Sequence, residues 1–590
     1  MMRTKSFPLP DLSRKEARPF IALGAAVLAW FPLPLRAEAP ISLSGAFLAA
    51  VVAVHRHDLA MADQACGLAV QAGMTDPAFI QMAERLAASD EGDEAVARAL
   101  SLARKLPFAP LSHLLLGDEA MRNKNWADAL ALFSAKGNGD FVSTAVPVQR
   151  AWALIGDGKA TDALAALHDG DARDLLAPLG LLQAARIKAR IDLTKAAPLF
   201  ARVQASRNGL PPLLDFLVAR PIADWKAAQG DPAGAKDVLA GLAALHPALA
   251  PVAARMTPDP DAARAPDPRR ALADFYTGLA LLLGSAQPPD QAHQEELRQA
   301  QLVLLRQAIW LAANAPRETA PAVVAIADVL ESDKQYRAAR SVLRMIGGDD
   351  PFRPLADRIE AQIALRQKDY AAALDALRRV TKLTPDDAAA QATLGDVLEA
   401  QNRDAEAVTA YDIAIADGAH RSEPLWSLLL SRAVALDHLD RRAAARADLE
   451  RALKLAPQEP ILLNYIGYSG VEHGDHPDES LDLLHRAMTL APGDAAIRDS
   501  YAWGILKLRG DAKAALPLLT SAAEGAPDDA EIAYHLGVAY WLTGRHLEAR
   551  DQWNQALGDT PEPDLRRQIE TALVHGPDLA LPTTSPHMTP

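Results

Sequence analysis

The sequence predicts an all-α protein in which helical hairpins stack into a solenoid, and three observations support this prediction. The chain has 590 residues, too many for a single hydrophobic core, so it either divides into domains or grows by stacking units. Half of its residues are apolar but only 5% are aromatic, a composition that suits close-packed helices better than sheets. The third observation is a pattern of small residues and prolines that repeats along the chain.

The repeat is clearest in the stretch AYHLGVAYWLTGRHLEARDQWNQAL, residues 533–557. A small residue in this stretch recurs upstream at spacings of 34, 35, 35, 38 and 34 residues, and the longer spacing falls in the polar segment GAHRSE. Six units therefore cover residues 354–562. The marker residues are Val380, Ala414, Ala452, Ala487, Ala522 and Ala556.

Packing explains why small and bulky residues keep this spacing. A small residue on the first helix of each unit, such as Gly395, Gly467 or Gly537, lets the second helix cross closely, and alanines do the same from the second helix. Proline then ends the second helix. The alanines are Ala407, Ala445, Ala515 and Ala549, and the bulky partners are Tyr411, Leu449, Leu484, Leu519 and Trp553.

This arrangement of Leu-Gly, alanine, a bulky residue and proline over 34 residues resembles the tetratricopeptide repeat. The resemblance implies a right-handed α-solenoid whose concave wall is made by the first helices. The repeat is weaker in residues 40–256, where Ala95, Ala129 and Ala163 keep the spacing and Gly117 precedes Phe133. A divergent array followed by a sharper one also resembles large exported tetratricopeptide proteins of Alphaproteobacteria, a resemblance that implies no assigned activity.

The segments around the repeats are predicted from composition. Residues 257–270 contain four prolines and read as a solvated linker or loop, and residues 271–353 as a helical connecting region. One continuous superhelix and two hinged halves both remain open. Residues 563–576 form an amphipathic helix that suits a cap on the last unit, and residues 577–590 are expected to be disordered.

The N-terminus predicts a signal peptide in residues 1–39. Basic residues precede the apolar run FIALGAAVLAWFPLPL, and small residues follow it, so we expect cleavage after Ala37 or Ala39 and export to a periplasm. Acidic residues in the basic region and Pro40 after the second cleavage position count against this interpretation. The alternative is a retained leader in a cytoplasmic or inner-membrane-anchored protein.

Charge and motifs argue against catalysis. A net charge of −14 disfavours nucleic-acid binding, and the single cysteine, Cys66, is expected in the core. The His-rich segments at residues 55–58 and 472–479 lack the spacing of metal ligands, and no catalytic or phosphate-binding motif occurs. The aspartate pairs at 386–387 and 528–529 suit helix caps. We therefore expect no cofactor, no metal and no enzymatic activity.

First-helix residues of the last three units are the candidate binding site. In this repeat family the equivalent positions line the concave groove, and here they are unusually aromatic, which suits capture of a protein or peptide. The alternative is that these aromatics only pack between adjacent helices. The predicted groove residues are Ile461, Asn464, Tyr468, Asp499, Trp503, Leu506, Glu531, Tyr534, Val538 and Trp541.

Three functions are consistent with these features. The first is a non-catalytic scaffold that binds envelope or periplasmic proteins through its concave groove. The second is a regulatory or recruiting subunit of an enzyme complex that acts on polysaccharide, peptidoglycan or protein in the envelope. The third is a cytoplasmic assembly factor. The identity of the partner separates them, because the scaffold itself is compatible with all three.

Overall fold

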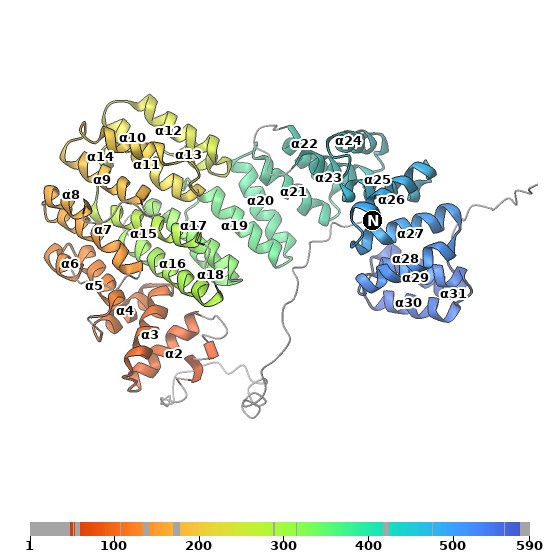
Figure 1. Ribbon diagram of the computed structural model, residues 1–590, viewed down its shortest axis with the longest axis horizontal. Coiled ribbons are helices and arrows are strands. Elements are labelled where there is room, and N and C mark those ends of the chain that lie inside the picture. The colour runs from red at the N-terminus through yellow and green to blue at the C-terminus, as the bar shows by residue number, and fades with distance from the viewer. Residues whose placement is uncertain are drawn as a thin grey trace, which may run out of the picture. The chain divides into compact units, whose positions relative to one another are not determined.

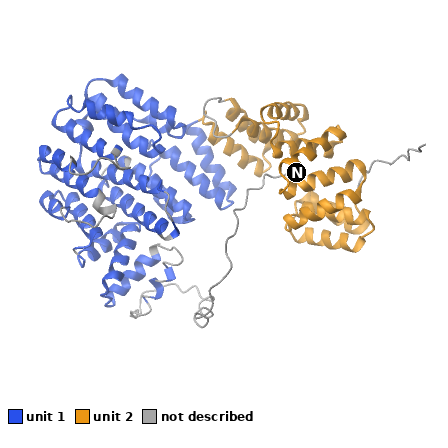
Figure 2. Ribbon diagram, in the orientation of Figure 1, with its two compact units in different colours: residues 1–384 blue, residues 385–590 orange. Residues whose placement is uncertain are grey.

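The computed structural model describes residues 46–578 apart from short gaps, and all its regular elements are helices (Figure 1). The predicted all-α solenoid is therefore confirmed. The chain divides into two compact units, residues 1–384 and residues 385–590 (Figure 2). The predicted signal peptide and residues 579–590 of the predicted tail lie outside the described residues. The gaps are at residues 47, 51, 54–58, 107, 134–140, 169–176, 287–289, 314–315, 417–423, 475 and 560.

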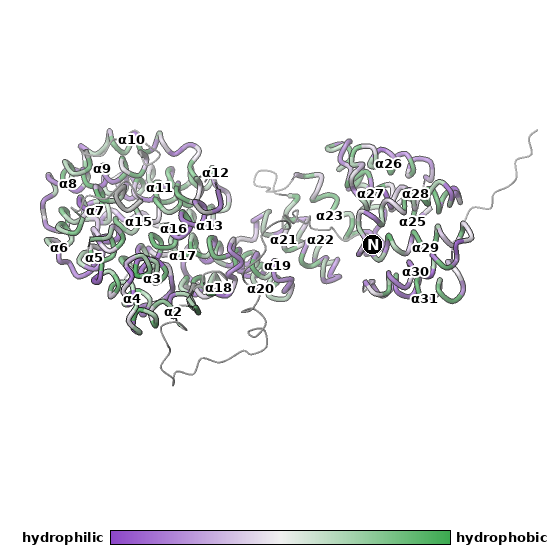
Figure 3. The backbone as a smooth tube through the Cα atoms, turned by 60° about the horizontal axis from the view of Figure 1, so that its bottom comes forward, coloured by the Kyte–Doolittle hydropathy of each residue, from purple (hydrophilic) through white to green (hydrophobic). Residues whose placement is uncertain are grey.

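The described residues of unit 2 form five helical hairpins and one further helix. Apolar and polar residues are mixed along the unit, which Figure 3 shows as green and purple stretches of the tube. The helices are α21 (Ala388–Ala400), α22 (Asp404–Ala416), α23 (Leu425–His438), α24 (Arg442–Leu455), α25 (Pro460–His473), α26 (Pro477–Leu490), α27 (Ala495–Arg509), α28 (Ala512–Gly525), α29 (Ala530–Leu542), α30 (His546–Gly558) and α31 (Pro563–His575).

The hairpins cross where the sequence predicts. A Cβ atom added to Gly537 would lie 2.3 Å from Nε1 of Trp553, and one added to Gly395 would lie 2.5 Å from the ring of Tyr411. Gly467 is equally tight, since its Cβ would lie 2.7 Å from Leu484 and 2.8 Å from the carbonyl oxygen of Ser480. These glycines are needed for close packing of two backbones. The predicted alanines Ala407, Ala445, Ala515 and Ala549 are all buried.

Replacing Gly537 by alanine should lower the free energy of unfolding by about 1–3 kcal/mol, because the new methyl group overlaps the Trp553 ring. Alanine is the better helix former, so propensity alone would give a gain of up to about 1 kcal/mol. Gly241 is the matched control, since it lies in a helix with open space around it. Thermal unfolding of both variants checks the prediction, and a stabilised Gly537→Ala variant would contradict it.

The hairpin of α23 and α24 keeps the predicted spacing, because the buried Ala433 lies 16 residues before Leu449, as Gly537 does before Trp553. The guanidinium of the adjacent Arg432 donates hydrogen bonds of 2.7 Å to both carboxylate oxygens of Asp448. Arg432 also contacts Asp412 of the preceding hairpin at 2.6 Å. Leu449 packs against the apolar cluster of Leu429, Leu430 and Val434 of α23, as predicted for the bulky residue of this hairpin. The sequence pattern gave no sign of the ion pair between Arg432 and Asp448, because it searched for small and bulky apolar residues rather than for opposite charges.

Each hairpin turn of unit 2 contains a described residue with a positive φ angle, and the turn between α25 and α26 contains two, Gly474 and His476. Lys368, Asn402 and Asp440 have φ angles of about 58°, and glycines take the same place in the next three turns. Lys334 lies 34 residues before Lys368 and has a φ angle of 61°. The repeated turn geometry therefore begins before residue 354, inside the region that the sequence predicts as a connection. Its glycine members in unit 2 are Gly474, Gly510 and Gly544.

Aspartates begin several of the helices in unit 2, as predicted for the pairs at unit boundaries. The carboxylate of Asp387 accepts a hydrogen bond of 3.1 Å from the backbone N–H of Ala390. That of Asp529 accepts from the backbone N–H of Glu531 at 3.0 Å. Such caps satisfy N–H groups that have no partner within the helix. At the other end, α31 buries Ile569 and Ala572 against the last hairpin.

Unit 1 begins with an array of irregular hairpins. The predicted spacing markers Ala95, Ala129 and Ala163 are fully buried, and a Cβ atom on Gly117 would lie 2.2 Å from the Phe133 ring. The helices of this array are α2 (Leu59–Gln71), α3 (Pro77–Ser89), α4 (Asp93–Ala103), α5 (Pro110–Arg122), α6 (Trp126–Leu132), α7 (Phe141–Gly156), α8 (Ala160–His168), α9 (Ala177–Ile191), α10 (Ala197–Ala205), α11 (Pro212–Ala228), α12 (Pro232–Leu245), η1 (Pro247–Leu249), α13 (Ala250–Arg255) and α14 (Pro260–Arg264).

The second part of unit 1 folds back against this array. In Figure 1, α15 lies beside α7, α9 and α11, and α16 packs on α3 and α5. The Tyr276 hydroxyl on α15 donates a buried hydrogen bond of 2.8 Å to Asp118, which is 158 residues earlier. The helices here are α15 (Pro268–Gly284), α16 (Gln291–Leu311), α17 (Pro316–Ser332), α18 (Tyr336–Leu343), α19 (Arg353–Arg366) and α20 (Tyr370–Leu383).

Residues 257–270 therefore do not form the solvated linker that their prolines suggest. Helix α14 packs on α9 and α11, and the Arg264 side chain donates a hydrogen bond of 2.9 Å to the carbonyl oxygen of Ala228. The backbone N–H of Asp259 donates to the Asp224 carboxylate at 2.7 Å. The division between the two units instead falls at residues 384 and 385. Composition signals a break in the repeat but cannot show that the segment folds back.

Candidate functional site

The predicted groove residues lie on three neighbouring first helices of unit 2, but most of them are buried. Trp503 is 5% exposed and Tyr534 is 6% exposed, whereas Ile461 is 48% exposed and Trp541 is partly exposed. The prediction of an exposed aromatic wall is therefore wrong for most of the set, and the alternative of packing between helices describes them better. The buried members are Asn464, Tyr468, Asp499, Trp503, Leu506, Tyr534 and Val538.

Stacking between α27 and α29 explains the burial. The Trp503 ring lies face to face with the imidazole of His535, with centroids 3.9 Å apart and planes 14° apart. Tyr534 packs beside the same indole at 6.4 Å. The Tyr468 hydroxyl on α25 donates a hydrogen bond of 2.6 Å to Glu531 on α29, and so links two first helices that have α26, α27 and α28 between them in the chain. These contacts fill the space between consecutive first helices.

Charged groups surround the stacked rings. The carboxylate of Glu472 accepts hydrogen bonds from Nε1 of Trp503 at 2.9 Å and from Nζ of Lys507 at 2.8 Å. Nδ1 of the His535 ring lies 2.9 Å from a carboxylate oxygen of Asp499, and both side chains are buried. We call Glu472, Asp499, Lys507, Glu531 and His535 the polar cluster of unit 2.

The environment of His535 favours its charged form. Burial by itself lowers the pKa of His535, but the carboxylates of Asp499, Glu531 and Glu472 outweigh burial and raise the pKa above its ordinary value. The contact of His535 with Asp499 and the stacking of its ring on Trp503 tie α27 to α29. Sequence analysis missed His535, Glu472 and Lys507, because repeat positions were chosen for exposure rather than for pairing with a neighbouring unit.

The raised pKa predicts how stability depends on pH. The pKa of His535 is higher in the folded protein than the value of about 6.5 in an unfolded chain. The contribution of His535 to the free energy of unfolding is therefore complete below about pH 6.5 and is lost as the pH rises through the folded pKa. The melting temperature should therefore fall across this range. His535→Gln should remove this part of the pH dependence in calorimetry, and an unchanged pH profile would contradict the assignment.

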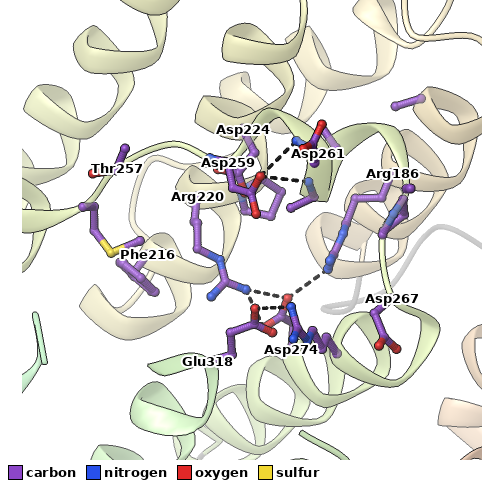
Figure 4. A pocket seen from close by; sticks show the side chains of 18 of the residues that line it. Arg186, Phe216, Arg220, Asp224, Thr257, Asp259, Asp261, Asp267, Asp274 and Glu318 are labelled. Carbon is purple, nitrogen blue, oxygen red and sulfur yellow. Dashed lines mark hydrogen bonds and ion pairs between the residues drawn. The ribbon is translucent and has the colours of Figure 1, made fainter. Parts of the chain in front are cut away.

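Unit 1 contains a cavity of about 540 Å³ that sequence analysis did not predict (Figure 4). Side chains of α9, α11 and α15 form its inner wall, and the segment from Met256 to Asp267 lies along its edge. The buried rings of Phe200, Phe216 and Phe352 supply apolar surface. Its residues come from segments far apart in the sequence, and for this reason no local pattern pointed to it.

Two arginines inside this cavity share one carboxylate. Nη1 of Arg186 lies 3.1 Å from the Asp274 carboxylate, and Nη2 of Arg220 lies 2.7 Å from both of its oxygens (Figure 4). The side chains of Arg186, Arg220 and Asp274 are 12%, 16% and 7% exposed, so this is a nearly buried ion triad. Arg270 and Glu318 form a second pair at 2.7 Å.

Burial also affects the carboxyl groups of the cavity. It raises the pKa of Asp224 to about 6, although the nearby Arg220 lowers it again in part. Burial likewise raises the pKa of Glu318, against the effect of Arg270. Asp224 and Glu318 lie on opposite sides of the two arginines in Figure 4. The cavity therefore presents both donors and acceptors to anything that enters it.

The described residues define a helical-repeat protein whose hairpins use small residues at each crossing and a left-handed residue in each turn. Residues 360–422 and 506–562 match the family model of the tetratricopeptide repeat. These two segments therefore carry tetratricopeptide repeats, as the sequence pattern predicts for residues 354–562. Proteins of this repeat family generally act as protein-interaction scaffolds. No curated protein matches the chain.

The chain is also similar to several solved structures. YrrB, described as a tetratricopeptide protein with an unusual peptide-binding site, is 20% identical to this chain. The alignment covers 34% of this chain and 99% of YrrB, with a TM-score of 0.25. The Cut9–Hcn1 assembly of the APC/C is 11% identical over 90% of this chain and 96% of its own, with a TM-score of 0.35. PilW, a type IV pilus biogenesis factor, is 21% identical to this chain, and the alignment covers 35% of this chain and 94% of PilW, with a TM-score of 0.31.

The described residues contain neither a membrane-spanning helix nor a metal-binding cluster. None of the helices in this part of the chain is long and apolar enough to cross a membrane. Among the same residues, no three His, Cys, Asp or Glu side chains lie close enough together to hold a metal ion. Cys66 lies in the core, as expected, and burial raises the pKa of its thiol to about 12. The His-rich segment at residues 55–58 lies outside the described residues.

Proposed function

We propose that the protein is a non-catalytic scaffold that is exported to the periplasm and binds an envelope protein or peptide through the first helices of unit 2. The repeat family supports a protein partner, and the order of residues in 1–39 supports export. The partner meets the edge of the stacked first helices rather than an open aromatic groove, because most of the aromatic side chains are already packed together.

The contrast between the two units is the observation that supports this choice of surface. In unit 1, helices α15 and α16 lie along the first helices of the N-terminal array and bury the side chains that a partner would otherwise contact. In unit 2, the described helices all belong to consecutive hairpins or to α31, so no additional helix of that unit covers its first helices.

Exposed residues on this surface suit a polypeptide partner. Ile461 at the start of α25 is half exposed and offers an apolar contact. The side chains of Glu472 and Lys507 are 39% and 24% exposed, so they can also form hydrogen bonds with a peptide backbone or side chains. Trp541 adds a partly exposed indole on α29. Asn464 and the other buried members of the predicted set pack beneath this surface and do not contact the partner.

Capture of the partner tests the proposal with two matched variants. The tagged full-length protein is cross-linked to its partner in cells, and the cross-linked protein is identified by mass spectrometry. Ile461→Arg should abolish capture, whereas Leu490→Arg, at a similarly exposed leucine on the second helix α26, should leave it intact. Equal capture by both variants, with normal melting temperatures, would contradict binding through the first helices.

Export has its own test. The mature protein should begin at Glu38 or Pro40 and should fractionate with the periplasm, since the basic, apolar and small segments follow the order of a signal peptide. N-terminal sequencing of the protein purified from cells, together with fractionation, measures both. An intact leader on a protein found in the cytoplasm would reverse the assignment and favour the assembly factor.

A further inference from the structure

We propose that the cavity of unit 1 binds a short peptide with two free termini, whose carboxylate is held by Arg186 and Arg220 and whose ammonium group is held by Asp224. This site is separate from the scaffold surface proposed for unit 2 and does not depend on it. Its volume of about 540 Å³ lies within the range of about 300–1,000 Å³ that is usual for small-ligand sites.

The two arginines have hydrogen-bonding capacity to spare. Each guanidinium carries five N–H donors in a planar fork. Among the described residues, Arg186 uses only Nη1 and Arg220 only Nη2, both toward Asp274. The remaining donors belong to side chains that line the cavity. A ligand carboxylate can accept hydrogen bonds from the remaining donors of both arginines.

Asp224 offers the complementary group. One of its carboxylate oxygens accepts a hydrogen bond of 2.7 Å from the backbone N–H of Asp259, and the other makes no hydrogen bond to a described residue. The side chain is 8% exposed and lies on the opposite side of Arg220 from Asp274 (Figure 4). An ammonium group placed beside Asp224 can therefore coexist with a carboxylate beside the arginines.

The balance of charge selects this class of ligand. The residues that line the cavity include four arginines and six carboxylates, so a polyanion meets an excess of like charge and a polycation meets the arginines at the inner wall. An apolar ligand would remove the arginines from water without giving them partners. A zwitterion can pair its negative group with the arginines and its positive group with the carboxylates. The charged residues are Arg186, Arg220, Arg255, Arg270, Asp224, Asp259, Asp261, Asp267, Asp274 and Glu318.

The length of the peptide follows from the rest of the lining. Phe216 and Phe352 pack edge to face at 5.0 Å and, with Phe200, give the cavity an apolar side. This surface can hold one or two small side chains between the charged termini. Thr257, Asp259 and Asp261 are exposed, so the segment between α13 and α15 is the edge at which a ligand enters.

Calorimetric titration of the full-length protein tests the site with two tripeptides, trialanine and Ala-Phe-Ala. Each is used in free, C-terminally amidated and N-acetylated form at millimolar concentration. We expect at least one free peptide to bind, and either modification to weaken binding by about tenfold or more, because each removes a charge-assisted hydrogen bond. Absence of binding by both free peptides, or equal affinity of the free and blocked forms, would overturn the proposal.

Variants of the cavity residues test which side chains hold each terminus of the peptide. In the Asp224→Asn variant, N-acetylation of the peptide should no longer weaken binding, whereas amidation should still weaken it. In the Arg220→Gln variant, amidation should no longer weaken binding, whereas N-acetylation should still weaken it. Because Arg220 belongs to the ion triad and its variant can fail to fold, Asp224→Asn, which leaves the triad intact, tests the assignment on its own. Arg202→Gln on α10, outside the cavity, is the control and should bind normally. If N-acetylation and amidation both still weakened binding in correctly folded Asp224→Asn and Arg220→Gln variants, the assignment would be wrong.

Discussion

Replacement of Trp503 by alanine is expected to lower the free energy of unfolding by about 3–5 kcal/mol. The indole is 5% exposed, stacks on His535 and donates a hydrogen bond to Glu472, so its removal leaves a cavity and takes one hydrogen-bond donor from Glu472 and the stacking partner from His535. Urea denaturation of the full-length protein, followed by circular dichroism, measures the change. The loss should be largest in the transition that corresponds to unit 2.

Alanine variants of two tryptophans in the last hairpin provide the comparison for Trp503→Ala. Trp553 is fully buried against Gly537, and its alanine variant should lose as much stability as that of Trp503. Trp541 is partly exposed, so its alanine variant should lose clearly less. If Trp503→Ala left stability unchanged but abolished capture of the partner, the residue would be a binding anchor, and the packing interpretation would be wrong.

Replacement of Asp274 by alanine is expected to cost about 3–5 kcal/mol in unit 1, because it leaves two nearly buried guanidinium groups without their shared carboxylate. The triad joins α9, α11 and α15, so its loss also loosens the helix that folds back along the array. Thermal unfolding monitored by calorimetry gives the measurement.

The matched control for Asp274 is another aspartate of the same cavity. Asp261 is 89% exposed and lies 3.4 Å from Arg264, so Asp261→Ala should change stability by no more than about 0.5 kcal/mol. Similar losses in both variants would indicate that the effect is general to this charged surface. A stable Asp274→Ala protein would mean that Arg186 and Arg220 do not need the shared carboxylate.

Local features of the fold could be predicted from the sequence because they follow from packing within one hairpin. The spacing of Gly537 and Trp553 is a property of two helices that cross once, and the same spacing found Gly117 and Phe133 in the divergent array. The caps at Asp387 and Asp529 depend only on the next few residues. Each of these contacts joins residues fewer than 20 positions apart.

Features that join distant segments could not be predicted in the same way. The hydrogen bond from Tyr276 to Asp118 spans 158 residues, and nothing in the pattern of α15 indicates that it lies along α7 and α9. Burial of Trp503 depends on how closely α27 approaches α29, which the repeat period does not specify. The cavity needs α9, α11 and α15 together, so it became visible only when the fold was known.

Hydrogen–deuterium exchange of the full-length protein, alone and cross-linked to its partner, tests most directly whether the partner binds the first helices of unit 2. Backbone amides of α25, α27 and α29 should exchange more slowly in the complex, because the partner covers the surface around Ile461, Glu472 and Lys507. Unit 1 should show unchanged exchange along α7, α9 and α11, which α15 already covers. Protection of these unit 1 helices, with none in α25, α27 or α29, would contradict the proposed scaffold.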